Sequence, residues 1–244
     1  MIKFFIYFSI VILTIFVFIF RRAIIRLPLL IYWIGRDMIL KDKEMFPYYG
    51  CWFFVGKQGS GKSIAIVELL ERLRKKYPKI KIYSNMGYTG ETAPLQSLND
   101  LMNGAFYNGI YGTVFVIDEI QNEFAASTSA NFPETILSVV TQQRKQRILI
   151  LCSSQVFTRV AKPLREQAFK VIECRTYFGR YTTCKYYDGV EYSDTFDYSD
   201  DTKFSKRPRI DYHSFVQSDK LRDCYDSYAL IERLSRVGFK TKIT

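Results

Sequence analysis

The sequence predicts an α/β fold in which a parallel β-sheet carries helices on both faces. Short apolar runs alternate with segments whose apolar residues recur at helical spacing. The runs are apolar throughout, which is typical of strands buried on both faces of a parallel sheet. A glycine-rich stretch follows the first run and an acidic pair ends a later one, so both features belong to the same edge of the predicted sheet.

Each predicted element follows from its spacing and its boundaries. Helix 63–77 has apolar residues every third position from Ile64 to Leu73, and Pro78 ends it. The predicted strands are residues 51–55, 79–83, 114–117, 147–152 and 171–174. The predicted helices between them are residues 63–77 and 133–144, with a short helix near residues 95–102.

The composition changes after Thr176 to a stretch rich in Tyr, Asp and Thr. Asp188 and Gly189 lie there between two alternating runs, a pattern that predicts a β-hairpin, and residues 221–234 are a predicted terminal helix. We therefore expect a small β-hairpin and helix extension behind the α/β domain. The predicted parts are an N-terminal anchor and interfacial segment (1–40), the α/β domain (41–176) and the extension (177–244).

Residues 4–20 contain no charged side chain and approach the roughly 20 apolar residues that a helix needs to span a bilayer. A cleaved signal peptide is the alternative, but only Lys3 precedes the run and no small-x-small cleavage site follows it. We therefore predict one transmembrane helix. Arg21, Arg22 and Arg26 come next, so the positive-inside rule places the N-terminus outside and the rest of the chain on the cytoplasmic side of an inner or plasma membrane.

The positive charge of the chain is uneven. The net charge is +11, which favours phosphate-rich partners such as nucleic acid, anionic lipid or nucleotide. Residues 1–50 hold 7 basic against 3 acidic side chains and residues 51–176 hold 16 against 10, whereas residues 177–244 hold 12 against 11. Within the first part, residues 27–34 form a second apolar patch that is too short to span and contains Pro28, which indicates an interfacial segment.

Cysteine and histidine usage argues against a zinc site. The single histidine is His213, and no CxxC pair is present, so zinc chemistry and a His-based triad are excluded by the sequence. An odd number of cysteines without a recognisable framework predicts reduced, structural thiols in a cytosolic chain. The five are Cys51, Cys152, Cys174, Cys184 and Cys224.

The stretch GKQGSGKS matches the phosphate-binding pattern G-x-x-x-x-G-K-[ST] and joins a predicted strand to a predicted helix. The glycines allow the backbone to curl round a phosphate, and the start of the helix adds its positive end. Lys62 is expected to reach the β- and γ-phosphates of ATP, and Ser63 to bind Mg²⁺. The predicted nucleotide-binding residues are Gly56, Lys57, Gln58, Gly59, Ser60, Gly61, Lys62 and Ser63.

The stretch TVFVIDEIQ delivers Asp118 and Glu119 from the end of an apolar strand to the same edge. Asp118 is suited to hold the magnesium ion, and Glu119 to orient and deprotonate an attacking water. A hydrolase requires both roles, so the two motifs together predict an ATPase.

The strand ILILCSSQ ends in polar residues at this edge, and Gln155 is the predicted sensor of the γ-phosphate, with a merely solvated strand end as the alternative. In an oligomeric ATPase an arginine reaches into the neighbouring site and stabilises the transition state. We favour Arg165 for this role over Arg159 and Arg144. The alternative is that these arginines are surface or nucleic-acid contacts.

Glu119 directly follows Asp118, and a predicted strand lies between the strand before the glycine-rich loop and the strand before this acidic pair. This pattern resembles the RecA-like ATPases that have an additional strand. A longer pattern resembles the FtsK and HerA motor group, and within it the Zot-like (zonula occludens toxin or phage assembly) ATPases. It consists of the run IDEIQNEF, a helix that begins with proline, the run QQRKQR, a strand ending SSQ, and Pro163-Leu164-Arg165. The resemblance covers residues 52–176. It implies that residues 56–63 bind the phosphates, that Asp118 and Glu119 are the acidic pair, and that Gln155 ends the sensor strand.

The resemblance also implies a setting. Zot-like proteins work at membranes in phage morphogenesis, and the broader group moves DNA through a ring, so a homo-oligomeric ring is expected. Zot-like proteins carry their membrane segment after the ATPase domain, whereas here it comes first, as in FtsK-type and conjugative motors. This placement favours movement or packaging of phage or plasmid DNA by a membrane-anchored translocase. Assembly and export of filamentous phage, and a nucleotide-binding membrane scaffold that hydrolyses nothing, are the alternatives.

Overall fold

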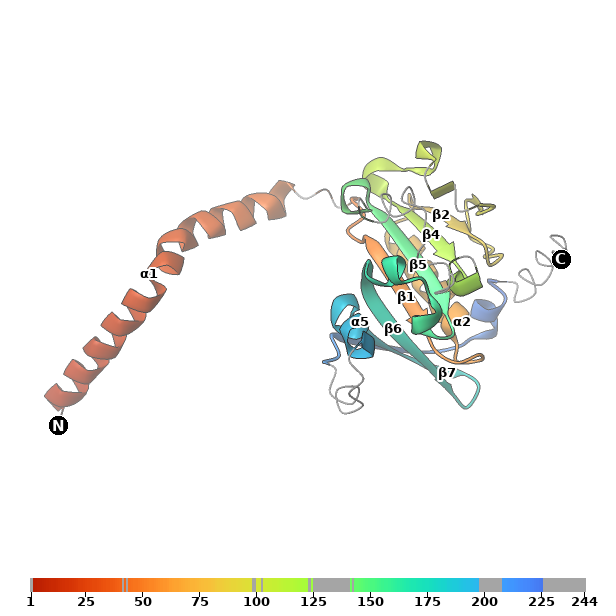
Figure 1. Cartoon of the computed structure of the whole chain (residues 1–244). Helices are drawn as coiled ribbons and strands as arrows, with labels where there is room; N and C mark the ends of the chain where they lie inside the picture. The colour runs from red at the N-terminus through yellow and green to blue at the C-terminus, as the bar shows by residue number, and fades with distance from the viewer. Residues whose placement is uncertain are drawn as a thin grey trace, which may run out of the picture. The chain divides into compact units, whose positions relative to one another are not determined.

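The computed structural model describes residues 2–40, 42, 44–97, 100–101, 103–122, 124, 141, 143–197 and 208–225. The chain forms two compact units, Met1–Met45 and Phe46–Thr244. The first unit is one long helix, and the second is an α/β domain built on a single sheet (Figure 1). The helices are α1 (Ile2–Leu40), α2 (Lys62–Lys76), α4 (Lys162–Arg165), α5 (Gly189–Asp197) and α7 (Asp219–Arg222). The strands are β1 (Gly50–Val55), β2 (Lys81–Ser84), β3 (Ala93–Pro94), β4 (Thr113–Ile117), β5 (Ile148–Ser154), β6 (Ala168–Tyr177), β7 (Tyr181–Asp188) and β8 (Asp211–Val216).

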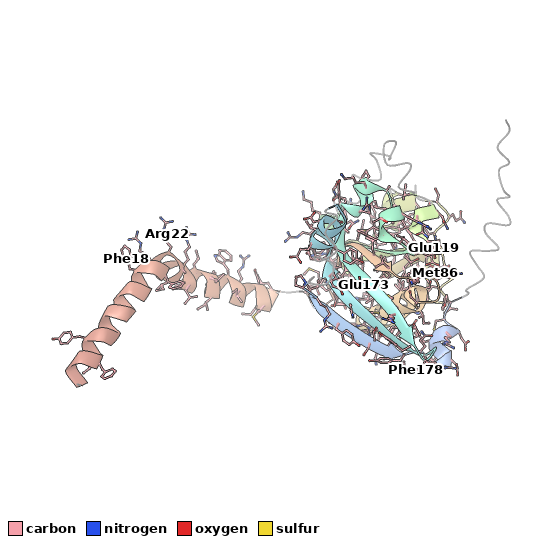
Figure 2. The ribbon with its side chains drawn as sticks, turned by 60° about the horizontal axis from the view of Figure 1, so that its bottom comes forward. Phe18, Arg22, Met86, Glu119, Glu173 and Phe178 are labelled. Atoms are coloured by element: carbon pink, nitrogen blue, oxygen red, sulfur yellow. The ribbon has the colours of Figure 1, made fainter. Side chains whose placement is uncertain are left out.

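Helix α1 runs without a break through Pro28, which lies in the predicted interfacial segment 27–34. A proline ring removes one helical hydrogen bond and crowds the carbonyl group four residues earlier, which bends a helix rather than ending it when the flanks are strongly helical. Figure 2 shows the bend close to Arg22. Within the residues that the structure describes, no helix is both long and apolar enough to qualify as a membrane span.

The sheet has eight strands in the order β3-β2-β4-β5-β1-β6-β7-β8. The strands from β3 to β6 are parallel, and β7 and β8 add to them in antiparallel fashion. The predicted parallel sheet is therefore confirmed for its central strands, but the whole sheet is mixed. Strand β5 lies between β1 and β4, which is the additional-strand arrangement expected from the resemblance.

Both faces of the sheet are covered, as predicted. Helix α2 packs on one face through Ile66 and Leu70, which are fully buried against side chains such as Phe54. On the other face Phe157 and Tyr192 pack against the buried strand residues, and α5 lies along β6 there (Figure 1). Alternate residues of the central strands β1, β4 and β5 therefore enter two separate apolar clusters, which is why these strands are apolar throughout.

The predicted hairpin at Asp188 and Gly189 is wrong. Asp188 ends β7, and its carboxylate accepts hydrogen bonds from the backbone N–H groups of Val190 (2.9 Å) and Glu191 (3.2 Å), so it begins helix α5. An aspartate before two free N–H groups is a good helix cap, and this local bonding prevails over the turn pattern. The hairpin instead turns between β6 and β7, where the fully exposed Phe178 projects (Figure 2).

The other predicted elements agree with the structure within a few residues where it describes them. The predicted strand 171–174 is longer than expected, because β6 extends from Ala168 to Tyr177 as the hairpin partner of β7. Most of the predicted helix 133–144 and of the terminal helix 221–234 lies outside the described residues, as does part of the short helix near 95–102.

Candidate functional site

The glycine-rich loop leaves β1 and enters α2 through three glycines with positive φ. Gly56, Gly59 and Gly61 have φ angles of 152°, 75° and 87°, which residues with a side chain rarely adopt. A Cβ atom on Gly56 would lie 2.5 Å from the Ser60 hydroxyl oxygen and 2.8 Å from the Cys174 carbonyl oxygen. The loop is therefore curled tightly over the end of β1, as a phosphate-binding loop must be.

Hydrogen bonds also connect the loop to strands β6 and β7. The Thr176 hydroxyl group lies 3.0 Å from the carbonyl oxygen of Ser60 and donates a hydrogen bond to it. The same hydroxyl oxygen lies 2.9 Å from that of Thr182 on β7. A Cβ atom on Gly61 would meet the Thr176 hydroxyl oxygen at 2.4 Å, so this position accepts only glycine without a shift of β6. The sequence did not indicate Thr176 or Thr182 as parts of the site.

Replacing Gly61 by alanine is expected to abolish nucleotide binding and to lower the free energy of unfolding by about 2 kcal/mol or more, because it adds a clash to the positive φ. Gly59→Ala is the matched variant, since Gly59 has a positive φ but open space around its Cα. It is expected to cost about 1 kcal/mol. Chemical denaturation and a fluorescent-nucleotide titration measure both; equal losses in the two variants would contradict the close contact with Thr176.

Two donors, one in the loop and one at the start of α2, are buried without an ion pair among the described residues. The Lys62 side chain is buried, with 6% of its surface exposed, and its ammonium group lies 3.3 Å from the carbonyl oxygen of Lys57. The Ser60 hydroxyl group is buried and has no hydrogen-bond partner among the described residues. Buried donors of this kind require an acceptor, and a phosphate oxygen at the start of a helix would supply it.

Asp118 lies directly after β4 and faces the end of the loop. Its carboxylate accepts hydrogen bonds from the hydroxyl groups of Ser63, at 3.3 Å, and Ser153. Its backbone N–H donates to the side-chain oxygen of Asn85, at 2.7 Å. The parallel register explains the meeting, since β4 and β1 both flank β5 and their carboxyl ends lie at one edge of the sheet. The sequence indicates Ser153 only as part of a polar strand end, and it gives no signal for Asn85, directly after β2.

Burial raises the pKa of Asp118 above its ordinary value of 3.8, and the nearby negative charge of Glu119 raises it further, while the Ser153 and Ser63 hydroxyl groups and the Lys62 cation oppose the shift. The folded state thus holds this proton more tightly than the unfolded chain does. Ionised Asp118 therefore lowers the free energy of unfolding once the pH has risen through the raised pKa. Well below pH 3.8 the residue is protonated in both the folded and the unfolded state, and this penalty is absent.

In nucleotide-free protein without Mg²⁺, Asp118→Asn is therefore expected to be more stable than the wild type at neutral pH. The difference should shrink as the pH falls toward the ordinary pKa of the residue. Denaturant titrations at several pH values measure this. A variant that is less stable than the wild type at neutral pH would show that the carboxylate is not penalised by burial.

Glu119 follows in a left-handed backbone conformation, with φ of 53°. Its backbone N–H donates to the Ser153 hydroxyl oxygen at 2.9 Å. The carboxylate accepts hydrogen bonds from the side-chain amides of Gln121 and Gln155, the latter at 3.4 Å to each oxygen. An uncommon φ at a non-glycine residue is typical of functional sites, and here two amides hold the carboxylate beside the loop.

A cavity of about 510 Å³ lies beside the glycine-rich loop and Glu119. Glu119 lines it together with the loop, and so do residues from β6, the β6–β7 turn and the segment after β8 that the sequence did not indicate. The lining residues are Gln58, Gly59, Gly61, Lys62, Ser63, Ile64, Glu119, Thr176, Gly179, Gln217, Arg222 and Tyr225. The only sequence signal for the last three was their polar or aromatic character in a region rich in such residues, which is not specific.

The arginines considered for a role in a neighbouring site do not line this cavity. The Arg165 guanidinium lies over the Phe157 ring, with 5.9 Å between the guanidinium carbon and the ring centroid, and Arg144 lies at the same distance over Tyr49. Arg159 is exposed at the end of a short 3₁₀ helix. A function of Arg165 in a second copy of the chain stays a prediction.

The residues present fit a nucleotide with its metal. The curled loop and the orphaned Ser60 hydroxyl group suit phosphate oxygens, and the paired oxygen atoms of Ser63 and Asp118 are the hard ligands that Mg²⁺ prefers. Lys62 and Glu119, one cationic and one anionic, line the same cavity. The fold and this site together define the class of the protein as a P-loop NTPase.

The fold is similar to the N-terminal domain of zonular occludens toxin from Neisseria meningitidis. The TM-score is 0.52 at 17% sequence identity, and the match covers 72% of this chain and 98% of that domain. The likeness to Zot-like proteins expected from the sequence is thus confirmed in the fold. Weaker similarities are to B204, the DNA-packaging ATPase of Sulfolobus turreted icosahedral virus, and to the cytoplasmic domain of the secretion ATPase EccC of Thermomonospora curvata.

For B204 the TM-score is 0.40 at 18% identity over 52% of this chain and 76% of that one. For EccC it is 0.40 at 15% identity over 52% of this chain and 21% of that one. At these TM-scores neither likeness bears on the fold assignment. No protein-family model matches the sequence, and no curated protein matches it.

Proposed function

We propose that this chain is a membrane-anchored ATPase that couples ATP hydrolysis to the movement or packaging of phage or plasmid DNA at the membrane, and that it works as a homo-oligomeric ring. The observation that carries the ATPase is that Lys62, Ser63 and Glu119 line one cavity, while Asp118 accepts a hydrogen bond from Ser63. DNA as the transported molecule is supported by the net charge of +11 and by the position of the apolar segment before the domain.

In this proposal each residue has a stated role. The loop N–H groups and the Lys62 ammonium bind the phosphates, and Ser63 and Asp118 hold Mg²⁺, which neutralises charge on the phosphates when bound. Glu119 orients a water molecule and accepts its proton. Gln155, whose amide already contacts both oxygens of Glu119, connects this carboxylate to the end of β5 and senses the γ-phosphate.

The membrane location rests on the first unit. Large apolar side chains of α1 are exposed, among them Phe18 at 69% and Ile25 at 76%. Exposed apolar side chains gain most from a lipid environment, and Arg21, Arg22 and Arg26 beside them favour a cytoplasmic α/β domain with the N-terminus outside. Pelleting of the full chain with membranes, resistant to carbonate and high salt, tests the anchor; release by either treatment would contradict it.

The DNA proposal predicts that ATP turnover by the full chain in detergent rises several-fold when DNA is added. Binding should weaken steeply between about 50 mM and about 200 mM salt, because basic side chains displace counterions from the phosphates. Phosphate release with and without DNA, and anisotropy of labelled DNA in a salt series, measure these effects. If DNA does not change the rate of ATP turnover and no salt-sensitive DNA binding is found, the ATPase proposal would stand but the DNA translocase proposal would fail.

Assembly and export of filamentous phage is the second candidate, favoured by the likeness in fold to the zonular occludens toxin domain. It predicts ATP turnover that responds to coat protein rather than to DNA. A nucleotide-binding scaffold is the third candidate, and it predicts binding without turnover.

A further inference from the structure

The segment after β8, residues 217–225, lines the nucleotide cavity through Gln217, Arg222 and Tyr225, and we call it the C-terminal strap. At one end, the Gln217 side-chain amide donates to the Thr182 hydroxyl oxygen at 2.7 Å, and thereby joins the hydroxyl network that holds the loop. At the other end, Tyr225 forms a β-bridge with Tyr88, behind β2, and the backbone N–H of Thr89 donates to the carbonyl oxygen of Cys224 at 2.9 Å. The strap is thus attached on both sides of the site.

Between these attachments the strap presents Arg222 to the cavity. The Arg222 guanidinium donates to the side-chain oxygen of Gln217, at 2.8 Å from one terminal nitrogen, and to the carbonyl oxygen of Gly179, at 2.5 Å. Both of these acceptors are uncharged. The nearby carboxylate of Asp219 is already paired with Arg180 at 2.7 Å. Among the residues that the structure describes, Arg222 is therefore held in position by neutral oxygens and has no carboxylate partner, so its positive charge can pair with another anion.

Tyr225, at the end of the strap, also lies within electrostatic reach of Asp118. Burial raises the pKa of Tyr225, and the charge of Asp118 raises it further, whereas Arg222 lowers it. Arg222 and Lys62 line the same cavity, so the guanidinium lies at the site where the phosphates of a nucleotide would bind. Arginine suits phosphate because its planar group can donate two parallel hydrogen bonds.

We propose that Arg222 binds a phosphate group of the nucleotide held by the loop of the same chain, as a second cation beside Lys62. This inference rests on the proposed nucleotide binding, and it gives the C-terminal region a direct part in the site. It differs from the arginine expected from a neighbouring subunit, because the strap belongs to the chain that holds the nucleotide.

The test measures the affinity of full-length protein in detergent for fluorescent ADP and ATP analogues. Arg222→Gln is expected to weaken both about tenfold, the loss of roughly one charge-assisted contact, and to flatten the salt dependence of binding. Lys220→Gln removes the same charge from the same strap, but its side chain does not line the cavity, so its affinity should be unchanged. Arg222→Lys keeps the charge without the planar group and should lose less than Arg222→Gln.

Thermal melting without nucleotide monitors the fold of each variant. Wild-type affinity in Arg222→Gln, or equal losses in Arg222→Gln and Lys220→Gln, would overturn the contact. If Arg222→Gln has a lower melting temperature than the wild type, the Arg222→Lys variant is compared instead. Weaker nucleotide binding by Arg222→Lys at an unchanged melting temperature supports the contact, and unchanged binding by Arg222→Lys overturns it. A wild-type protein that binds neither analogue would instead remove the proposed nucleotide binding itself.

Discussion

Replacing Lys62 by alanine is expected to abolish ATP turnover and to weaken nucleotide binding by about 10- to 100-fold, the cost of losing a charge-assisted contact to phosphate. The ammonium is buried and bonded only to the Lys57 carbonyl oxygen among the described residues, so no structural ion pair is lost with it. The substitution removes a favourable charge near Asp118 but no carboxylate hydrogen bond among the described residues, so the fold should stay intact. Phosphate release and a fluorescent-nucleotide titration measure the two effects.

Lys75→Ala is the matched control, because Lys75 belongs to the same helix but is exposed at its far end. It should turn over ATP like the wild type. If Lys62→Ala keeps wild-type turnover at an unchanged melting temperature, the loop does not bind the phosphates and the ATPase proposal fails.

Replacing Glu119 by glutamine should lower ATP turnover by about 100- to 10,000-fold, the range for removing a general base, while nucleotide affinity stays within a few-fold of the wild type. Glutamine has the same shape and can still bond to the amide groups of Gln121 and Gln155, but it cannot accept a proton from water. Single-turnover hydrolysis, measured beside equilibrium binding, separates the chemical step from binding.

Glu166→Gln serves as the control, since this carboxylate is exposed in a surface pair with Lys162 and lies away from the cavity lining. A Glu119→Gln variant that retains turnover would assign the base elsewhere. If biological function survives complete loss of turnover in this variant, the non-hydrolysing scaffold becomes the better description.

The central part of the fold was predictable because its signals are local. The strands β1, β4 and β5 are short apolar runs, and α2 has a continuous apolar stripe that Pro78 terminates. The motif pattern located residues 56–63 and the acidic pair, and the rule that parallel strands share a ligand-binding edge predicted that they meet.

The errors arose where local signals competed. Asp188 and Gly189 favour a turn by composition, yet the Asp188 carboxylate caps α5. The mixed character of the sheet was also hidden, because β7 and β8 alternate polar and apolar residues and their partners cannot be identified from the residues alone.

The sequence alone determined which residues are chemically suited to bind phosphate, hold a magnesium ion and activate water, because motif spacing and residue type suffice for that. Only the tertiary structure decided what surrounds them: Asn85 and Ser153 around Asp118, Thr176 beneath the loop, and Arg222 over the cavity. These residues come from strands and a strap that are distant along the chain. Their roles depend on strand order and register, which the folded chain settles by burying two apolar clusters at once.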